Sequence, residues 1–421
     1  MELSNKKEYS IFQKILLNPI FLFLIVASSM WSVWDITKSE SSEELLMKKA
    51  NELAQKFIIT DGHIDVPWRL HKGGYEDLSV RTPGGDFDYV RATEGGLDVP
   101  FMSIYVPATY QVTGGAKAMA EELIGMVERI TTDHPDKFEI AYNVSDADRI
   151  VSEGKIALPM GMENGAPIEG DLKNIEYFHN KGISYITLTH SKDNAICDSS
   201  YDTTGTHQGL SSFGAEVVTE MNRVGVMVDI SHVSDNAFYQ VMDITKVPAI
   251  ASHSSCRHFT PGFERNMSDD MIKRLAENGG VIQINFGSSF VTKSSQDKRT
   301  ANGEKVSQYA EENNLESDDP KVQEFAKQVA EDNPVFCDVT DVADHIDRVV
   351  ELAGIEHVGF GSDYDGVGDT LPYGLKDPSD FPNLIYHLLK RGYSEEDIEK
   401  ICYKNVWRVW KATEEFANSQ S

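Results

Sequence analysis

Eight short apolar runs set the strongest constraint on the fold of this chain. Most are rich in β-branched or aromatic residues, and segments of helical periodicity separate each run from the next. This alternation predicts parallel strands joined by helices, and the near-continuous apolar character predicts strands that are covered on both faces. The runs are KFIIT, VPFMSIYV, KIALPM, ISYITLT, VGVMVDI, VPAIAS, GVIQINF and HVGFGSD. Eight strands predict a closed (β/α)8 TIM barrel of the α/β class, with a doubly wound open sheet as the alternative.

Ionisable side chains follow six of these runs, at the point where each strand is expected to end. In a (β/α)8 barrel the C-terminal ends of all strands meet at one mouth, whereas an open sheet would gather such groups near one crevice. The positions therefore favour the barrel. A single His at a strand end is more often a hydrogen-bonded structural residue, but so many in successive strands predict a shared site. The residues are His63, Asp65, Glu163, His190, His232, His253 and Asp363.

This set of donors predicts a site for two metal ions. His63 and Asp65 are two residues apart, so their side chains point to the same side of an extended chain. Three His and three carboxylates, one His fewer than the set contains, are already too many for one tetrahedral zinc ion, but they suit two ions about 3.5 Å apart that share a carboxylate and a hydroxide. Glu163, within PMGMENGAP, is the candidate bridge. Nitrogen and oxygen ligands without sulfur favour two Zn²⁺, with Mn²⁺ or Co²⁺ as substitutes.

Charge and cysteine content exclude several kinds of partner and site. The 421-residue chain has 67 acidic and 39 basic residues, which gives a formal net charge of −28. Such a surface repels nucleic acid and anionic lipid, so a polyanionic partner is not expected. The four cysteines show no CxxC spacing, which argues against a thiolate zinc site or a redox motif.

The N-terminal segment predicts export. Three lysines precede ILLNPIFLFLIVASSMWSVW, a stretch of 20 uncharged residues that ends at Asp35. The short apolar centre and the small residues after it favour a cleaved signal peptide, whereas the total length favours a membrane anchor. We expect residues 1–34 to be one of these two, with a buried helix as a third interpretation. The rest of the chain is then extracytoplasmic, whether periplasmic, secreted or membrane-anchored.

A single barrel domain is expected over residues 50–416. A polar insert at about 288–338 separates the seventh run from its helix and would overhang the mouth of the barrel. We interpret it as a solvated excursion of the chain, that is, a solvent-exposed insertion with no catalytic role, and a moving lid is the alternative. The last two helical segments, of which the second opens with a capping box at Ser394 and Asp397, are expected to close the bottom and side of the barrel.

Six motifs, taken in order, resemble those of a known family. They are DGHIDVPW, GMENG, YITLTHS, VDISHVSD, ASHSSCRHF followed by ERNMSDDMI, and GFGSDYDGV. Between about residues 55 and 412 the chain resembles the membrane (renal) dipeptidase family, a group of amidohydrolase-like (β/α)8 zinc metallopeptidases. Each motif alone is a weak signal, whereas six at compatible spacing are specific.

The resemblance implies a set of metal ligands. His63 and Asp65 would bind one zinc ion, and His232 and His253 would bind the other. Glu163 would bridge the two ions.

The resemblance also implies how the substrate is held. His190 would hold the scissile carbonyl and its developing oxyanion, Arg265 would bind the C-terminal carboxylate, and Asp363 would handle the proton. The chemistry agrees, because two cations acidify a shared water and an Arg grips a carboxylate with two parallel hydrogen bonds. Asp365 is the alternative to Asp363, and Arg257 is the alternative to Arg265.

The sequence therefore predicts a zinc-dependent dipeptidase in which a metal-bridging hydroxide attacks the peptide bond of a dipeptide. Short substrates follow from Arg265, because a longer C-terminal side would find no room beside the metals. Two alternatives stay open: a related binuclear amidohydrolase acting on another small amide or lactone, and a non-catalytic barrel that binds a ligand. A membrane tether through the N-terminal segment and a homodimer are both compatible with the sequence.

Overall fold

The computed structural model describes residues 41–420. The chain divides into two compact units, Met1–Lys48 and Lys49–Ser421, and the barrel lies within the second. The predicted signal peptide or anchor at residues 1–34 lies outside the described residues. Within residues 41–420, no helix combines the length and the apolar character that crossing a membrane requires.

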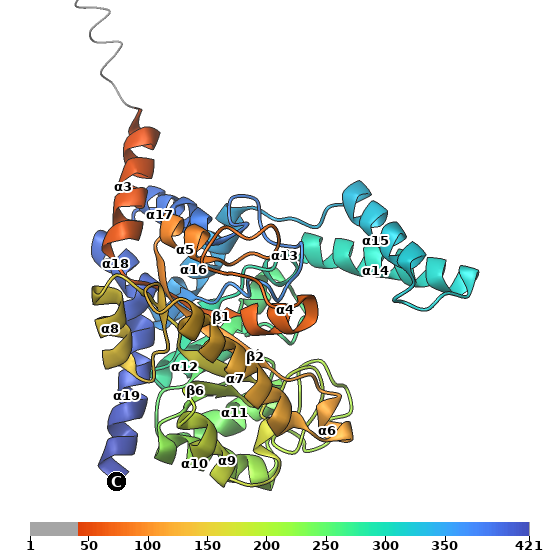
Figure 1. The fold of residues 1–421 in the computed structure, drawn as a ribbon, viewed down its shortest axis with the longest axis horizontal. Helices are drawn as coiled ribbons and strands as arrows, with labels where there is room; N and C mark the ends of the chain where they lie inside the picture. Colours follow the sequence, from red (N-terminus) through yellow and green to blue (C-terminus); the bar gives the residue numbers. More distant parts are fainter. Residues whose placement is uncertain (1–40, 421) are drawn as a thin grey trace, which may run out of the picture. The chain divides into compact units, whose positions relative to one another are not determined.

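Eight parallel strands form a closed barrel, which confirms the predicted fold (Figure 1). Their order around the barrel is β1-β10-β9-β8-β7-β6-β5-β2, and β1 pairs with both β2 and β10, which excludes an open sheet. The strands are β1 (Ile59–Ile64), β2 (Leu97–Tyr105), β5 (Met160–Glu163), β6 (Ile183–Thr187), β7 (Met227–Asp229), β8 (Ile250–Ser254), β9 (Val281–Ile284) and β10 (Val358–Phe360).

Helices connect these strands and cover the outside of the barrel (Figure 1). Gly225, in a left-handed conformation with φ 97°, ends the helix before β7. The longer helices are α3 (Ser42–Lys56), α4 (Val66–Gly73), α5 (Tyr89–Gly95), α7 (Ala116–Asp133), α8 (Val144–Ser152), α9 (Lys173–His179), α10 (Ser212–Val224), α11 (Asp235–Ile244), α12 (Asp269–Glu277), α14 (Lys293–Asn313), α15 (Pro320–Asp332), α16 (Val339–Ala353), α17 (Phe381–Lys390) and α19 (Asn405–Gln420). Three short helices complete the set: α6 (Tyr110–Thr113), α13 (Ser288–Val291) and α18 (Glu395–Glu399).

Two strands differ from the runs predicted for them. The first strand continues beyond KFIIT through His63, because its buried polar groups find partners: Asp61 accepts backbone N–H groups of His63 at 3.0 Å and Ser362 at 2.9 Å. The third run, KIALPM, is divided at Pro159, which has no N–H to donate. Its first half is β4 (Ile156–Ala157), which pairs with β3 (Phe138–Glu139) outside the barrel, and the barrel strand β5 begins after the proline.

An apolar cluster fills the barrel at the N-terminal ends of its strands. Trp407 and Trp410 on α19 pack into this cluster, and Trp410 lies against Phe101 with ring centroids 5.2 Å apart. The prediction that the last helices close the bottom of the barrel is therefore confirmed, and Ser394 forms the predicted capping box of α18. The strand residues of the cluster are Val99, Phe101, Tyr185, Met227, Ile250 and Val281.

The predicted insert after the seventh strand is mostly a pair of helices, α14 and α15 (Figure 1). The two helices pack against each other through Tyr309 and Phe325, whose stacked rings lie 4.2 Å apart. Ser295 is the buried residue of α14, so most of this helix faces solvent, as expected of a solvated excursion. Its first turns differ from that expectation, because Arg299 borders the cavity at the mouth of the barrel.

Candidate active site

The structure brings the seven predicted strand-end residues together at the C-terminal mouth of the barrel. His63 lies in β1 and His253 in β8, Glu163 is the last residue of β5, and Asp65 directly follows β1. His190, His232 and Asp363 each come three residues after the end of β6, β7 and β10. A cavity of about 650 Å³ opens above them, and six of the seven line it: Asp65, Glu163, His190, His232, His253 and Asp363.

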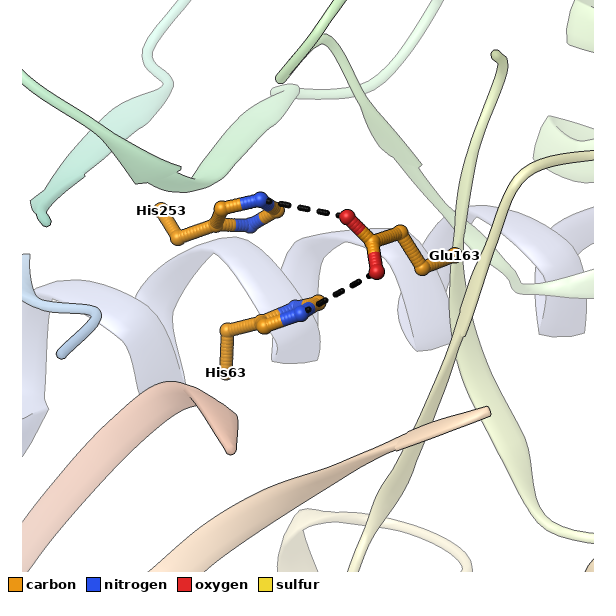
Figure 2. A group of neighbouring side chains, drawn as sticks. All are labelled: His63, Glu163 and His253. Carbon is orange, nitrogen blue, oxygen red and sulfur yellow. Dashed lines mark ion pairs between the residues drawn. The ribbon is translucent and has the colours of Figure 1, made fainter. Parts of the chain in front are cut away.

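Glu163 lies at the centre of this cluster. Its Oε2 is 3.5 Å from Nε2 of His63, and its Oε1 is 3.4 Å from Nε2 of His253, so the two rings approach different oxygens of one carboxylate (Figure 2). Oε1 also lies 3.0 Å from Nε2 of His232 and 3.6 Å from Nε2 of His190. A carboxylate so placed can touch two neighbouring cations at once.

Hydrogen bonds fix the tautomers of two of these histidines. The Tyr185 hydroxyl donates to the Gly62 carbonyl oxygen, so it accepts a hydrogen bond from Nδ1 of His63 at 2.9 Å. The Ser252 hydroxyl donates to Asp229 at 2.6 Å in the same way, so it accepts from Nδ1 of His253 at 2.7 Å. In the neutral rings, the lone pair on Nε2 of each His therefore points into the cluster, as in metal-binding His.

Burial and charge tune the protonation of the cluster. Burial alone would raise the pKa of Glu163, but the charges of His190 and His63 and the hydrogen bonds from His232 and His253 hold it well below its usual range. Burial lowers the pKa of His232 and of His253 far below the ordinary value, and the Arg265 charge lowers both further. At neutral pH Glu163 is therefore ionised and His232 and His253 are neutral, which are the protonation states that bind metal ions. Against burial, the interactions with Tyr185, Glu163 and Asp65 raise the pKa of His63, so a metal ion there would displace a proton.

The buried donors fit metal ions. His63 Nε2 and Asp65 Oδ1 are buried without a hydrogen-bond partner, and unsatisfied groups of this kind are costly unless something binds them. Nε2 of His232 and Nε2 of His253 approach within 2.9 Å, an arrangement that a shared cation would stabilise. Three overlapping groups have ligand atoms within 4.8 Å of one another: His63, Glu163 and His253; Glu163, His190 and His232; and His63, Asp65 and Asp363.

Asp363 is grouped with His63 and Asp65 in the cluster. Burial first, and then the charge of Asp65, raise the pKa of Asp363 to about 8, so this carboxyl carries a proton at neutral pH. The Asn285 amide donates to Asp363 Oδ2 at 2.8 Å. Gly366 allows the approach of Asp65 and Asp363, because a Cβ at this position would lie 2.1 Å from the first carboxylate and 2.2 Å from the second. The site can thus place a proton donor beside the metal ligands.

The two alternative residues have other partners. Asp365 receives the Asp86 backbone N–H at 2.6 Å, pairs with Arg69 at 3.3 Å and borders a different cavity. Arg257 forms two hydrogen bonds with Asp235, at 2.7 and 2.6 Å. Their geometry favours Asp363 and Arg265 for the predicted roles.

Arg265 is buried directly behind the cluster. It donates to Ser254 Oγ and to the His253 carbonyl oxygen, both at 2.8 Å, and its Nε has no partner. Its guanidinium carbon lies 5.5 Å from the ring centre of Phe290, which lines the cavity. Arg265 itself is not among the lining residues, so a substrate carboxylate would have to reach it past Phe290.

Backbone strain also marks the mouth of the barrel. His232 and Asp363 have φ values of 69° and 65°, in the left-handed region that non-glycine residues rarely adopt. Asn164, which follows Glu163, has a φ of 82°. Strain of this kind persists where the surrounding structure holds functional side chains in place.

Sequence reasoning missed the contributions of the second and seventh strands and of the loops. Tyr105, the last residue of β2, lines the cavity with its ring 4.8 Å from that of His190, and Asn285 directly follows β9. Both positions could have been found by asking which polar side chain ends each remaining strand. Loops and the first two turns of connecting helices supply the other lining residues, and strand periodicity holds no signal for them: Trp68, Ser191, Lys192, Tyr201, Phe290, Arg299, Gly366 and Val367.

A closed (β/α)8 barrel with buried His and carboxylate donors at its mouth defines a metal-binding hydrolase of the amidohydrolase-like class. Residues 47–421 match the family described as membrane dipeptidase, peptidase family M19. The chain therefore belongs to this family of dipeptidases, and the predicted resemblance is confirmed.

Two fungal relatives support the assignment. The Uncharacterized dipeptidase C965.12 of Schizosaccharomyces pombe is 31% identical over 394 residues, which cover 88% of this chain and 84% of that protein. Dipeptidase tcpJ of Claviceps purpurea is 31% identical over 374 residues, which cover 86% of this chain and 78% of the relative.

Solved structures share the fold. The probable dipeptidase PvdM of Pseudomonas aeruginosa superposes with a TM-score of 0.76 at 27% identity, over 88% of this chain and 99% of that one. A metallopeptidase of Rhodobacter sphaeroides, solved with a phosphinate mimic of the dipeptide L-Ala-D-Ala, has a TM-score of 0.69 at 23% identity, over 85% and 99% of the two chains.

Proposed function

We propose that this protein is a zinc-dependent dipeptidase that binds two Zn²⁺ per chain, with Mn²⁺ or Co²⁺ as substitutes. The observation that carries the proposal is the position of Glu163, whose two oxygens face His side chains from different strands. His63 and Asp65 would hold one ion, His232 and His253 would hold the other, and Glu163 would contact both. Family membership supports peptide hydrolysis as the reaction class.

When bound, the ions would acidify a water molecule and polarise the scissile carbonyl. The protein's own residues supply the remaining steps. His190 extends into the cavity with a side chain that is 20% exposed, and burial lowers its pKa, so a neutral imidazole can donate a hydrogen bond to the developing oxyanion. Asp363 lines the cavity beside the proposed metal ligands, so its carboxyl can pass a proton to the leaving amine.

Arg265 would select for substrates with a free C-terminal carboxylate. Its Nε and the unused N–H groups of its guanidinium are available for a carboxylate, and they lie close to the cluster because Arg265 bonds to the His253 carbonyl oxygen. A cavity of about 650 Å³ is the size expected for a small-molecule site. These two features support dipeptides over longer chains.

A panel of dipeptides with L- or D-residues at the C-terminal position, assayed with and without a chelator, tests this proposal. We expect metal-dependent cleavage of at least one stereochemical series. Arg265→Ala should raise KM for dipeptides about 100-fold and should abolish the preference for a free carboxylate over a C-terminal amide. Arg265→Lys keeps the charge and should recover part of that preference.

The same panel separates the alternatives. If Arg265→Ala leaves KM for dipeptides unchanged, the site favours a related amidohydrolase acting on another small amide or lactone. If the protein contains bound metal but cleaves no dipeptide, a ligand-binding barrel without catalytic activity is the better account.

Export is a separate proposal, supported only by the apolar segment within residues 1–34. We propose that the barrel functions outside the cytoplasm, released by signal cleavage or tethered by this segment. N-terminal sequencing of the protein from its native host distinguishes the two: a new N-terminus after residue 27 indicates cleavage, and an intact one indicates an anchor.

A further inference from the structure

The cavity has a basic side chain that the metal cluster and Arg265 leave unexplained. Arg299, on the second turn of α14, lines the cavity and has an exposed side chain. Its guanidinium donates to Ser289 Oγ at 3.0 Å and forms no ion pair with a carboxylate among residues 41–420. The other lining cation, Lys192, differs in this respect because it lies 3.6 Å from Asp202.

Arg299 lies on the same side of the cavity as Arg265. Ser289, which holds Arg299, is the neighbour of Phe290, and the Phe290 ring packs under the guanidinium of Arg265. Burial raises the pKa of Tyr201, and the charges of Arg265 and Arg299 both oppose that rise, so both guanidiniums are within electrostatic range of one phenol.

Two carboxylates, Asp65 and Asp363, also line the cavity, where they meet at Gly366. A dipeptide whose C-terminal residue lies beside the cations Arg265 and Arg299 would have its N-terminal amine free to approach these carboxylates. One of those cations, Arg265, already has a partner in the C-terminal carboxylate.

We propose that Arg299 is a specificity residue that binds a carboxylate on the side chain of the substrate's C-terminal residue, so that the enzyme prefers dipeptides ending in Asp or Glu. This inference rests on the proposed function, because it takes the main-chain carboxylate to be bound by Arg265. An Arg can form two parallel hydrogen bonds with a carboxylate, and Ser289 orients the guanidinium for this contact.

The charge of the whole protein makes such a contact useful. With a net charge of −28, the surface repels a doubly carboxylated substrate, so a local cation at the mouth of the cavity must offset that repulsion. Because Arg299 is exposed, its interaction with a carboxylate is partly screened by water and salt. We therefore expect an effect of about 10-fold on binding and little effect on the chemical step.

The test compares Ala-Glu with Ala-Gln, which have the same shape but differ in side-chain charge, in whichever stereochemical series the enzyme cleaves. The wild-type enzyme should favour Ala-Glu about 10-fold in kcat/KM, through a lower KM. Arg299→Gln should abolish this preference by raising KM for Ala-Glu, with kcat and the Ala-Gln parameters unchanged. Arg299→Lys should retain part of the preference.

Lys305→Gln is the matched control, because Lys305 is an exposed cation on the same helix that does not line the cavity. It should keep the full preference for Ala-Glu. The inference is overturned if the wild-type enzyme does not distinguish the two substrates, or if Arg299→Gln lowers kcat/KM equally for both. In either case cleavage of Ala-Gln would leave the proposed function intact, whereas failure to cleave any dipeptide would contradict both.

Discussion

The two ends of the barrel are built from the same strands but differ in chemistry. β8 begins with Ile250, which packs into the apolar cluster over α19, and contains His253 near its other end. β6 likewise carries Tyr185 in the apolar cluster and leads, beyond its last residue, to His190. Within a few residues, each of these strands passes from hydrophobic packing to buried ionisable groups.

Because of this difference, the bottom of the barrel mainly contributes stability and the mouth mainly contributes activity. At the bottom, burying the indole rings of Trp407 and Trp410 removes apolar surface from water and stabilises the fold. At the mouth, burying ionised groups and holding residues such as His232 at positive φ cost stability, and that cost is tolerable only where the groups bind something. Substitutions at the mouth should therefore reduce activity, and substitutions at the bottom should reduce stability.

Replacing the central carboxylate should give the largest effect at the mouth. Glu163→Gln keeps the shape but removes the charge that faces four histidines, so we expect kcat/KM to fall at least about 10³-fold for every dipeptide. Bound metal, measured by elemental analysis, should fall as well. The exposed Glu216→Gln on α10 is the matched control and should keep both values. Full activity in Glu163→Gln would contradict the role given to this residue.

The bottom of the barrel should respond in the opposite way. Trp410 is 1% exposed, and Trp410→Ala should lower the free energy of unfolding by about 3–5 kcal/mol because it leaves a cavity. The activity of the folded fraction, measured well below the unfolding transition, should stay within about twofold of wild type. Trp410→Phe should show a smaller loss of stability. If kcat of the folded protein falls sharply, the two ends are not separable.

The proton donor should affect turnover more than binding. Asp363→Asn removes the acidic proton but keeps the contact with Asn285, so kcat should fall about 10²-fold with KM little changed. Asp365→Asn is the control, because its pairing with Arg69 places it outside the reaction: its kcat should remain near wild type while its stability falls. If Asp365→Asn loses more kcat than Asp363→Asn does, then Asp365 and not Asp363 is the proton donor.

A residue that supports a ligand should change metal affinity rather than the reaction itself. Ser252→Ala removes the oxygen that accepts the His253 N–H, so zinc affinity, measured by competition with a chelator, should fall about 10-fold. At saturating zinc, kcat should recover. Ser184→Ala is the matched control, since Ser184 is a buried strand serine whose hydroxyl has no partner. Equal zinc affinity in the two variants would show that Ser252 does not support His253 as a metal ligand.

The smallest effect should come from a buried carboxyl at the start of β2. Burial raises the pKa of Asp98 to about 7, against an unfolded value near 3.8, so its ionisation destabilises the fold above pH 7 and this cost fades as the pH falls toward 4. These pKa values would give a difference of about 2.6 kcal/mol between pH 5 and pH 8, and solvent screening of the half-buried Asp98 reduces it. Asp98→Asn should therefore raise stability by about 1 kcal/mol more at pH 8 than at pH 5, measured by urea unfolding. An equal change at both pH values would contradict burial as the cause, and activity should not change.

The sequence predicted the barrel and the metal cluster because both follow from strand periodicity. A strand's end is visible in the sequence, and all strand ends meet at one mouth, so residues as distant as His63 and Asp363 could be grouped before any contact was known. Pro159 also carries a signal, since it divides the third run between two strands, but the apolar character of KIALPM continues across it and predicts a single strand.

The cavity wall was harder to predict because loops and the first turns of connecting helices build it. Arg299 belongs to a helix whose periodicity indicates solvent exposure, and only the path of the chain after β9 brings its second turn to the cavity. The partners of Arg265 and Arg257 were equally hidden, because hydrogen bonds that run from a connecting segment to another element leave no pattern in the sequence. The residues that strands position, which form the metal cluster, were therefore predictable from the sequence. The residues that connecting segments position, which determine substrate specificity, were not.

Zinc titration of the chelator-treated enzyme tests the central claim most directly. The account predicts that dipeptide hydrolysis is absent without metal and rises with added zinc to a plateau at two equivalents per chain, because Glu163 lies between two groups of ligands. A plateau at one equivalent would contradict the two-ion site. Full activity of the metal-free protein would contradict the account of the barrel mouth altogether.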